Sequence, residues 1–183
     1  MVTEEQALRI LESKELRKGV EAYQAIRRRF EETDVSSDRD FWRVFRAFYR
    51  LRRNDEFAGK YFALMQSYKG RTVPTFSQVF SELYDATGRC EVSFSSKLLN
   101  LLDPVTPIWD SIVATNRFGF KMPYASVRER NRVCIERYEA FKTAFLTYVS
   151  SAEGQNLIAL FDRTFPDSGL SDTKKVDFIL WKS

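Results

Sequence analysis

One short stretch of this sequence combines an amine and a carboxylate with an apolar helix and two prolines. Residues 93–113 read SFSSKLLNLLDPVTPIWDSIV. Lys97 lies on a short helix predicted over residues 94–102, and Asp110 begins the next, predicted over residues 110–116. Because the residue before a proline avoids helical angles, the chain must cross between the two helices. We therefore expect Lys97 and Asp110 to lie at the ends of adjoining helices.

An amine and a carboxylate in this arrangement suit attack on a sugar carbon. Burial penalises the charged form of a lysine and lowers its pKa, and the neutral amine is a nucleophile. Lys97 could attack C1′ of a sugar while Asp110 stabilises positive charge as a glycosidic bond breaks. Each residue also has a structural interpretation, Asp110 as an N-cap and Lys97 as a side chain that extends to water. Trp109 is either a core residue or a surface on which a base stacks.

Five arginines suggest a second kind of site. Arg39, Arg43, Arg46, Arg50 and Arg53, here called the arginine row, recur every three or four residues in a helix predicted over residues 38–54. Such spacing places them on one face. Because guanidinium groups pair well with phosphate oxygens, the arginine row could bind the backbone of DNA or another nucleic acid. The alternative is a solvated helix face, partly paired with acidic residues.

Composition limits the other possibilities. The 183 residues contain no histidine, which excludes Ser-His and Cys-His nucleophiles and histidine metal sites. Cys90 and Cys134 lie far apart in sequence, so we expect two buried thiols, with no metal and no cofactor. The net charge of +4 permits an anionic partner. No apolar run approaches the ~20 residues of a membrane span, and the N-terminus is acidic and amphipathic. We therefore expect a cytoplasmic protein.

The surrounding segments have the periodicity of helices. Capping boxes begin helices at Thr3 and Thr75, each with a glutamine three residues later. The first helix is expected to continue to Phe30 with a break near Gly19, and a long helix is expected over residues 124–150, with a buried stripe from Cys134 to Tyr148. Short loops join the helices, without repeats or linkers. The sequence therefore predicts an all-α fold in which residues 1–183 form a single helical domain.

The stretch around Lys97 also resembles a known enzyme family. SFSSKLLNLL followed by TPIWDSIV is similar to the core of the helix-hairpin-helix DNA glycosylases, with Lys97 at the position of the catalytic lysine and Asp110 at that of the catalytic aspartate. The resemblance implies a compact multi-helix architecture and base excision from DNA. Four features differ from the family pattern. Ser111 and Ile112 replace the Thr-His that commonly follows the aspartate, and the sequence has no cysteine cluster for an iron–sulfur centre. EVSF at residues 91–94 replaces the glycine-rich hairpin, and the lysine and aspartate are several residues closer together than usual.

A further resemblance is to uncharacterised bacterial proteins that share S-F-x-S-K-x-L, P-I-W-D and D-F-x-L-W, the last at residues 177–181 here. It covers about residues 76–181 and implies no established activity. In this C-terminal segment Asp177 could pair with a nearby arginine, and no catalytic role is expected.

Three functions follow from these features. The first is a DNA glycosylase or lyase that uses Lys97 and Asp110. The second is a non-catalytic nucleic-acid binder that needs only the arginine row. The third is a helical module that binds another protein. The sequence indicates no oligomeric state.

Overall fold

The computed structural model of the protein describes residues 2–122 and 129–183, and every regular element in these ranges is helical. The elements are α1 (Glu4–Leu11), α2 (Lys14–Glu32), α3 (Arg39–Tyr49), α4 (Asp55–Tyr68), α5 (Phe76–Thr87), α6 (Val92–Leu102), the π-helix η1 (Ile112–Arg117), α7 (Arg130–Val149), α8 (Ala152–Thr164) and α9 (Asp172–Lys182). The prediction of an all-α fold is confirmed for the described ranges.

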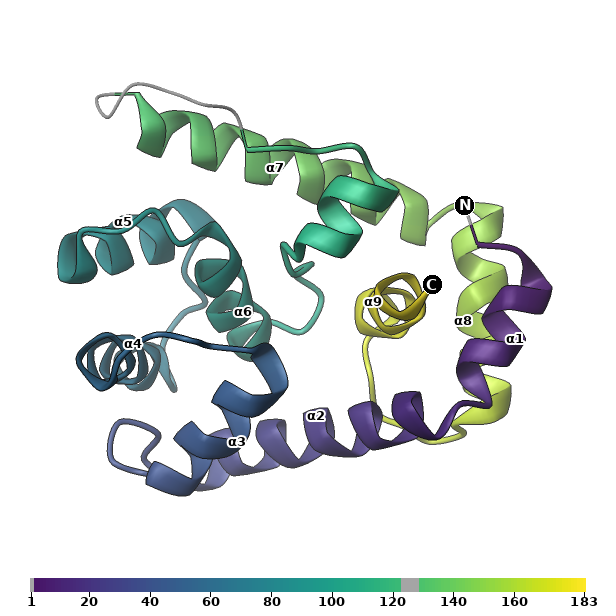
Figure 1. The fold of residues 1–183 in the computed structure, drawn as a ribbon, viewed down its shortest axis with the longest axis horizontal. Helices are drawn as coiled ribbons and strands as arrows, with labels where there is room; N and C mark the ends of the chain where they lie inside the picture. The colour runs from purple at the N-terminus through teal and green to yellow at the C-terminus, as the bar shows by residue number, and fades with distance from the viewer. Residues whose placement is uncertain (1, 123–128) are drawn as a thin grey trace.

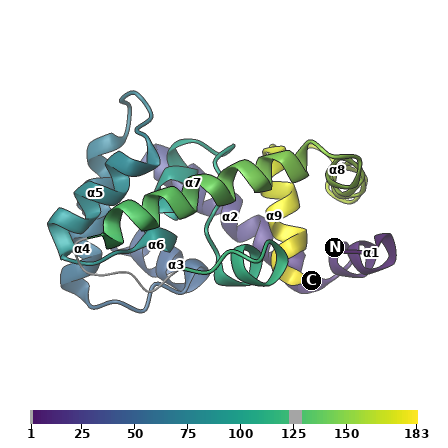
Figure 2. The same cartoon turned by 90° about the horizontal axis from the view of Figure 1, so that it is seen from above.

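Two long helices, α2 and α7, run along opposite edges of the molecule, and α6 and α9 lie between them (Figure 1). α1 packs on α8 at one end, and α4 packs on α5 at the other. From above, α7 extends between these two ends, from α5 to α8 (Figure 2). α9 contacts α1, α7, α8 and η1, while α6 contacts α5 and α7. Because α6 and α9 are covered on most sides, even their polar residues are buried.

Local signals determine where the first helices begin. Both predicted capping boxes form, at the start of α1 and of α5. The N-terminal helix breaks at Ser13, not near Gly19 as predicted. Ser13 Oγ accepts a hydrogen bond from the amide of Leu16 and caps α2. Gly19 lies inside α2, next to the ring of Phe178 in α9.

The helix predicted over residues 38–54 ends at Tyr49, five residues early. Arg50 has a left-handed conformation, with φ 53° and ψ 42°, and the amide of Leu51 donates to the carbonyl of Arg46 over 3.0 Å. This is the hydrogen bond of a Schellman helix end, and the buried Leu51 anchors it. Helical spacing gave no sign of this end, because arginine rarely adopts left-handed angles.

The second half of the chain follows the prediction more closely. The described part of the helix predicted over residues 124–150 is α7, and residues 124–128 lie outside the described residues. Its stripe from Cys134 to Tyr148 is buried as expected. The helix predicted from Asp110 is a π-helix that begins two residues later. None of the helices in the described ranges combines the length and apolarity that a bilayer crossing requires.

Candidate functional site

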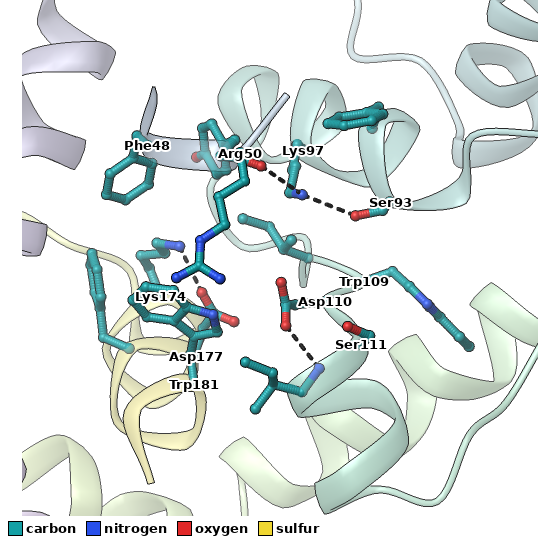
Figure 3. A pocket seen from close by; sticks show the side chains of 15 residues that line it. Phe48, Arg50, Ser93, Lys97, Trp109, Asp110, Ser111, Lys174, Asp177 and Trp181 are labelled. Atoms are coloured by element: carbon teal, nitrogen blue, oxygen red, sulfur yellow. Dashed lines mark hydrogen bonds and ion pairs between the residues drawn. The ribbon is translucent and has the colours of Figure 1, made fainter. Parts of the chain in front are cut away.

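A pocket of about 350 Å³ lies where the end of α3, one side of α6, residues 108–112 and α9 meet (Figure 3). Its wall contains five charged side chains, from Arg50, Lys97, Asp110, Lys174 and Asp177. Aromatic side chains from α3, α6 and α9 complete it. The fold therefore brings together Lys97 and Asp110, the two residues that the sequence singled out as a catalytic pair.

Lys97 projects from α6 and is only 7% exposed. Its amine donates a hydrogen bond of 3.0 Å to Ser93 Oγ and a longer one of 3.4 Å to the carbonyl of Tyr49. The amine also lies 4.9 Å from the centre of the Phe94 ring. Burial lowers the pKa of Lys97 to about 8, although the nearby Asp110 opposes this shift. The interpretation of Lys97 as a side chain that extends to water is therefore wrong.

Side chains of the central helices fix the crossing that carries Asp110. On α6, Asn100 Nδ2 donates to the carbonyl of Thr106 over 2.7 Å, and Ser96 Oγ accepts from the amide of Trp109 over 2.9 Å. Hydroxyl groups of α7, of α9 and of the residue that caps α9 donate to the carbonyls of residues 104, 105 and 107. Because these bonds satisfy backbone groups that no helix pairs, the crossing is held in one position.

Asp110 follows the crossing, and its carboxylate points into the pocket (Figure 3). Its Oδ1 accepts a hydrogen bond of 2.8 Å from the amide of Ile112. The N-cap of η1 is Ser111, which makes no side-chain capping bond, so Asp110 is not the N-cap that the sequence offered as its structural role. The contact of Asp110 with Ile112 is the two-residue bond of an Asx turn. The Asp110 carboxylate can still accept further hydrogen bonds, because a carboxylate has two oxygens and about four acceptor positions.

Trp109 is a core residue. Its ring points away from the centre of the pocket (Figure 3) and packs edge-on against Phe141, with 5.2 Å between ring centres. A different tryptophan, Trp181 of α9, lines the pocket, and the guanidinium group of Arg50 lies 6.0 Å from the centre of its ring.

The sequence did not predict that α9 forms one wall of the Lys97 pocket. Lys174 Nζ and Asp177 Oδ2 lie 2.6 Å apart, and their side chains are 4% and 8% exposed. The partner of Asp177 is therefore a lysine and not an arginine. The available signals were the three-residue spacing of this pair and the D-F-x-L-W motif. Neither sufficed, because ion pairs at that spacing usually lie on exposed helix faces.

The arginine row does not form one continuous face, because its last two members lie beyond the end of α3. Arg46 and Arg53 each lie 2.6 Å from a carboxylate. Arg50 lines the pocket, whereas Arg39 and Arg43 are exposed on α3. The arginine row is therefore divided into groups of residues with different surroundings. Its contact with nucleic acid stays a prediction.

Within the described residues, no group of three or more cysteine, aspartate or glutamate side chains could hold a metal ion. Comparisons with models of protein families, with curated proteins and with solved structures find no match to this chain. The case for a function therefore rests on the chemistry of the pocket.

Proposed function

We propose that this pocket is the site of a DNA-directed base-excision glycosylase or lyase, with Lys97 as nucleophile and Asp110 as the group that stabilises positive charge. One observation carries the proposal. An amine with a lowered pKa and a carboxylate come from separate elements and line the same pocket. The helix-hairpin-helix glycosylase architecture, suggested by the resemblance of residues 93–113, belongs to the same proposal.

Nucleophilic attack requires the neutral amine. With a pKa of about 8, about one Lys97 amine in ten is neutral at pH 7, against fewer than about one in a thousand for an ordinary lysine. On a nucleotide the amine attacks C1′, and the bond from C1′ to the base breaks with its electron pair leaving on the base. The nitrogen of Lys97 then passes one proton to the departed base. The bond from C1′ to the ring oxygen breaks with its electron pair leaving on that oxygen, which takes the second proton of the nitrogen, and a C=N bond from C1′ to Lys97 remains. On an abasic sugar the same C=N bond forms with loss of water.

The pocket wall suits the other requirements of this reaction. Positive charge develops at C1′ as the base leaves, and a fixed carboxylate such as Asp110 stabilises it. A base must leave the duplex to reach a buried amine, and about 350 Å³ is within the range of small-molecule sites. The rings of Phe48 and Trp181 line the same pocket and offer flat surfaces against which a base can stack.

Exposed arginines supply the backbone contacts in this proposal. Arg39 and Arg43 on α3, with Arg50 at the pocket, are available to phosphate groups. A non-catalytic nucleic-acid binder would use these arginines alone, and a protein-interaction module would need neither them nor Lys97. The free thiols of Cys90 and Cys134 fit a reducing cytoplasmic location.

Reduction with borohydride tests the nucleophile, because it converts a C=N bond to Lys97 into a stable covalent link. The substrates are a duplex with one abasic site and a panel of duplexes with damaged bases. We expect a trapped complex with the wild type and none with Lys97→Ala. Lys97→Met, which conserves volume, should behave as Lys97→Ala does. Asp110→Asn should trap more slowly, and Lys60→Ala, which removes an exposed lysine of α4, should trap as the wild type does.

Two results would contradict the proposal. A complex that still forms with Lys97→Met would assign the nucleophile to another residue. A folded wild type that traps none of the substrates would exclude the lyase. Salt-dependent duplex binding without trapping would then favour the non-catalytic binder.

A further inference from the structure

A second pocket, of about 330 Å³, lies at the start of α6. Its lining comes from the loop between α3 and α4, the end of α5, the turn between α5 and α6, and the first residue of α7. Its charged side chains are those of Arg53, Arg89, Arg130 and Glu91. We propose that this arginine pocket binds a phosphate group.

Glu91 does not neutralise the arginine pocket. Its side chain is 9% exposed and lies 2.6 Å from the NH2 nitrogen of Arg53. One carboxylate against three guanidinium groups leaves a net charge of about +2 at neutral pH. The pairing fixes the orientation of Arg53 without using all its donors, since a guanidinium group has five N–H bonds. Arg53 Nε is buried and has no hydrogen-bond partner in the described structure.

The other two arginines come from distant segments and are exposed to solvent. Gly88 ends α5 with φ 66° and begins the turn that carries Arg89, while Arg130 is the first residue of α7. Among the ion pairs of the described ranges, which include that of Arg53 with Glu91, none involves Arg89 or Arg130. Three guanidinium groups around one hollow repel one another unless an anion lies between them. Phosphate fits such a site, because its oxygens match the paired donors of guanidinium groups.

The position of the arginine pocket relates it to the Lys97 site. Glu91 and Lys97 are six residues apart, or about 9 Å along α6. A nucleic-acid strand with a sugar at Lys97 would therefore have a nearby backbone phosphate within reach of the arginine pocket, and this link rests on the proposed function. A small phosphate monoester would use the same arginines. Phosphate binding itself does not depend on the proposed chemistry of Lys97.

A double substitution, Arg89→Ala with Arg130→Ala, tests the arginine pocket. Both side chains are exposed, so the fold should survive, whereas removal of Arg53 would leave Glu91 buried and unpaired. The matched control is Arg9→Ala with Arg163→Ala. It removes two exposed arginines from α1 and α8, at the opposite end of the molecule (Figure 1).

The two probes are inorganic phosphate, measured by titration calorimetry, and an undamaged DNA duplex, measured by fluorescence polarisation at several salt concentrations. We expect wild type and control to bind phosphate and the double variant to bind it at least tenfold more weakly. If the phosphate belongs to a nucleic-acid backbone, the slope of log K against log salt should also fall by about 1.8 in the double variant, at about 0.9 for each lost contact.

The two binding measurements distinguish a free phosphate ligand from a phosphate of a nucleic-acid backbone. Loss of phosphate binding with unchanged duplex binding would show that the arginine pocket binds a free phosphate group and not a nucleic-acid backbone. If neither probe distinguishes the double variant from the control, the inference is overturned. None of these measurements uses trapping at Lys97, so this inference and the proposed glycosylase or lyase activity can fail separately.

Discussion

The Lys97 pocket and the exposed side of α3 both concentrate charge, but water reaches them very differently. In the pocket, the side chains of Lys174 and Asp177 are 4% and 8% exposed and lie 2.6 Å apart. On α3, those of Arg43 and Asp40 are 75% and 65% exposed and lie 3.6 Å apart. Solvent screens the second pair, whereas the first has lost its hydration and depends on its partner.

This difference shows which charge patterns indicate a site in this protein. The arginine row is regular in sequence, yet only Arg50 lines the Lys97 pocket, and the other members lie in solvent or pair with acids. The five charged residues of the pocket have no common spacing and meet only through folding. Burial of a charge costs free energy, so a fold that buries several around one hollow is a stronger indication of function than an exposed repeat.

The largest effect should follow from breaking the buried pair. Asp177→Leu leaves the Lys174 amine without its partner, between the rings of Tyr23 and Phe178 at 4.7 and 4.6 Å. We expect the free energy of unfolding to fall by about 3–5 kcal/mol, measured by urea denaturation. The double variant Lys174→Met with Asp177→Leu should recover most of this loss. Equal losses in the single and double variants would show that packing, not the unpaired charge, is responsible.

The exposed counterpart on α3 is the matched control for that experiment. Asp40→Ala removes the partner of Arg43 in solvent, so the free energy of unfolding should change by less than about 1 kcal/mol. A loss as large as that of Asp177→Leu would remove the distinction between the two regions.

A smaller effect should appear as a pH dependence of stability. The pKa of Lys97 is lowered from 10.5 to about 8 in the folded protein, so the unfolded chain binds the proton more tightly. Below pH 8 both states hold the proton, and the full cost of a buried charge remains. Between pH 8 and 10.5 the folded state is already neutral, so stability rises with pH. Relative to Lys97→Met, the wild type should gain about 3 kcal/mol of unfolding free energy between pH 7 and 11.

Urea denaturation across this pH range measures the gain, and the exposed Lys60, replaced in the same way, is the control. If the difference between wild type and Lys97→Met stays constant from pH 7 to 11, the amine is not buried in solution.

Much of the helical framework could be predicted because its signals are local. A capping box involves residues three apart, and the stripe on α7 repeats every three or four residues. The end of α3 could not be predicted in this way. It depends on a left-handed Arg50 and on burial of Leu51 against the rest of the protein, and neither leaves a pattern in the neighbouring sequence.

The site could be predicted only where one short segment builds it. Lys97 and Asp110 are joined by a single crossing, so their spacing carried information about their proximity. Lys174 and Asp177 come from a helix far along the chain, and its side chains reach the same pocket only after folding. The hydroxyl bonds from Ser171 and Thr173 to the crossing are equally long-range. Periodicity describes one face of one helix, and it does not show that α9 is buried on several faces.

The smallest effects should distinguish two members of the arginine row, Arg43 and Arg46. Arg43 is 75% exposed in its side chain, so Arg43→Ala should leave the free energy of unfolding within about 0.5 kcal/mol of the wild type. If α3 contacts a DNA backbone, this variant should lower the salt slope of duplex binding by about 1. Arg46 instead donates to Asp55 and to the carbonyl of Arg53, each over 2.6 Å. Arg46→Ala should therefore cost about 1 kcal/mol of stability and leave the salt slope unchanged.

Urea denaturation and fluorescence polarisation of both variants measure the two responses. These arginines are three residues apart in sequence, so opposite responses would show that surroundings, and not spacing, decide what each one does. If Arg43→Ala and Arg46→Ala weaken duplex binding equally, the arginine row acts as one surface despite its divided structure. The regular spacing would then be the better guide to DNA contact, and the contrast between pocket and exposed helix would hold for stability alone.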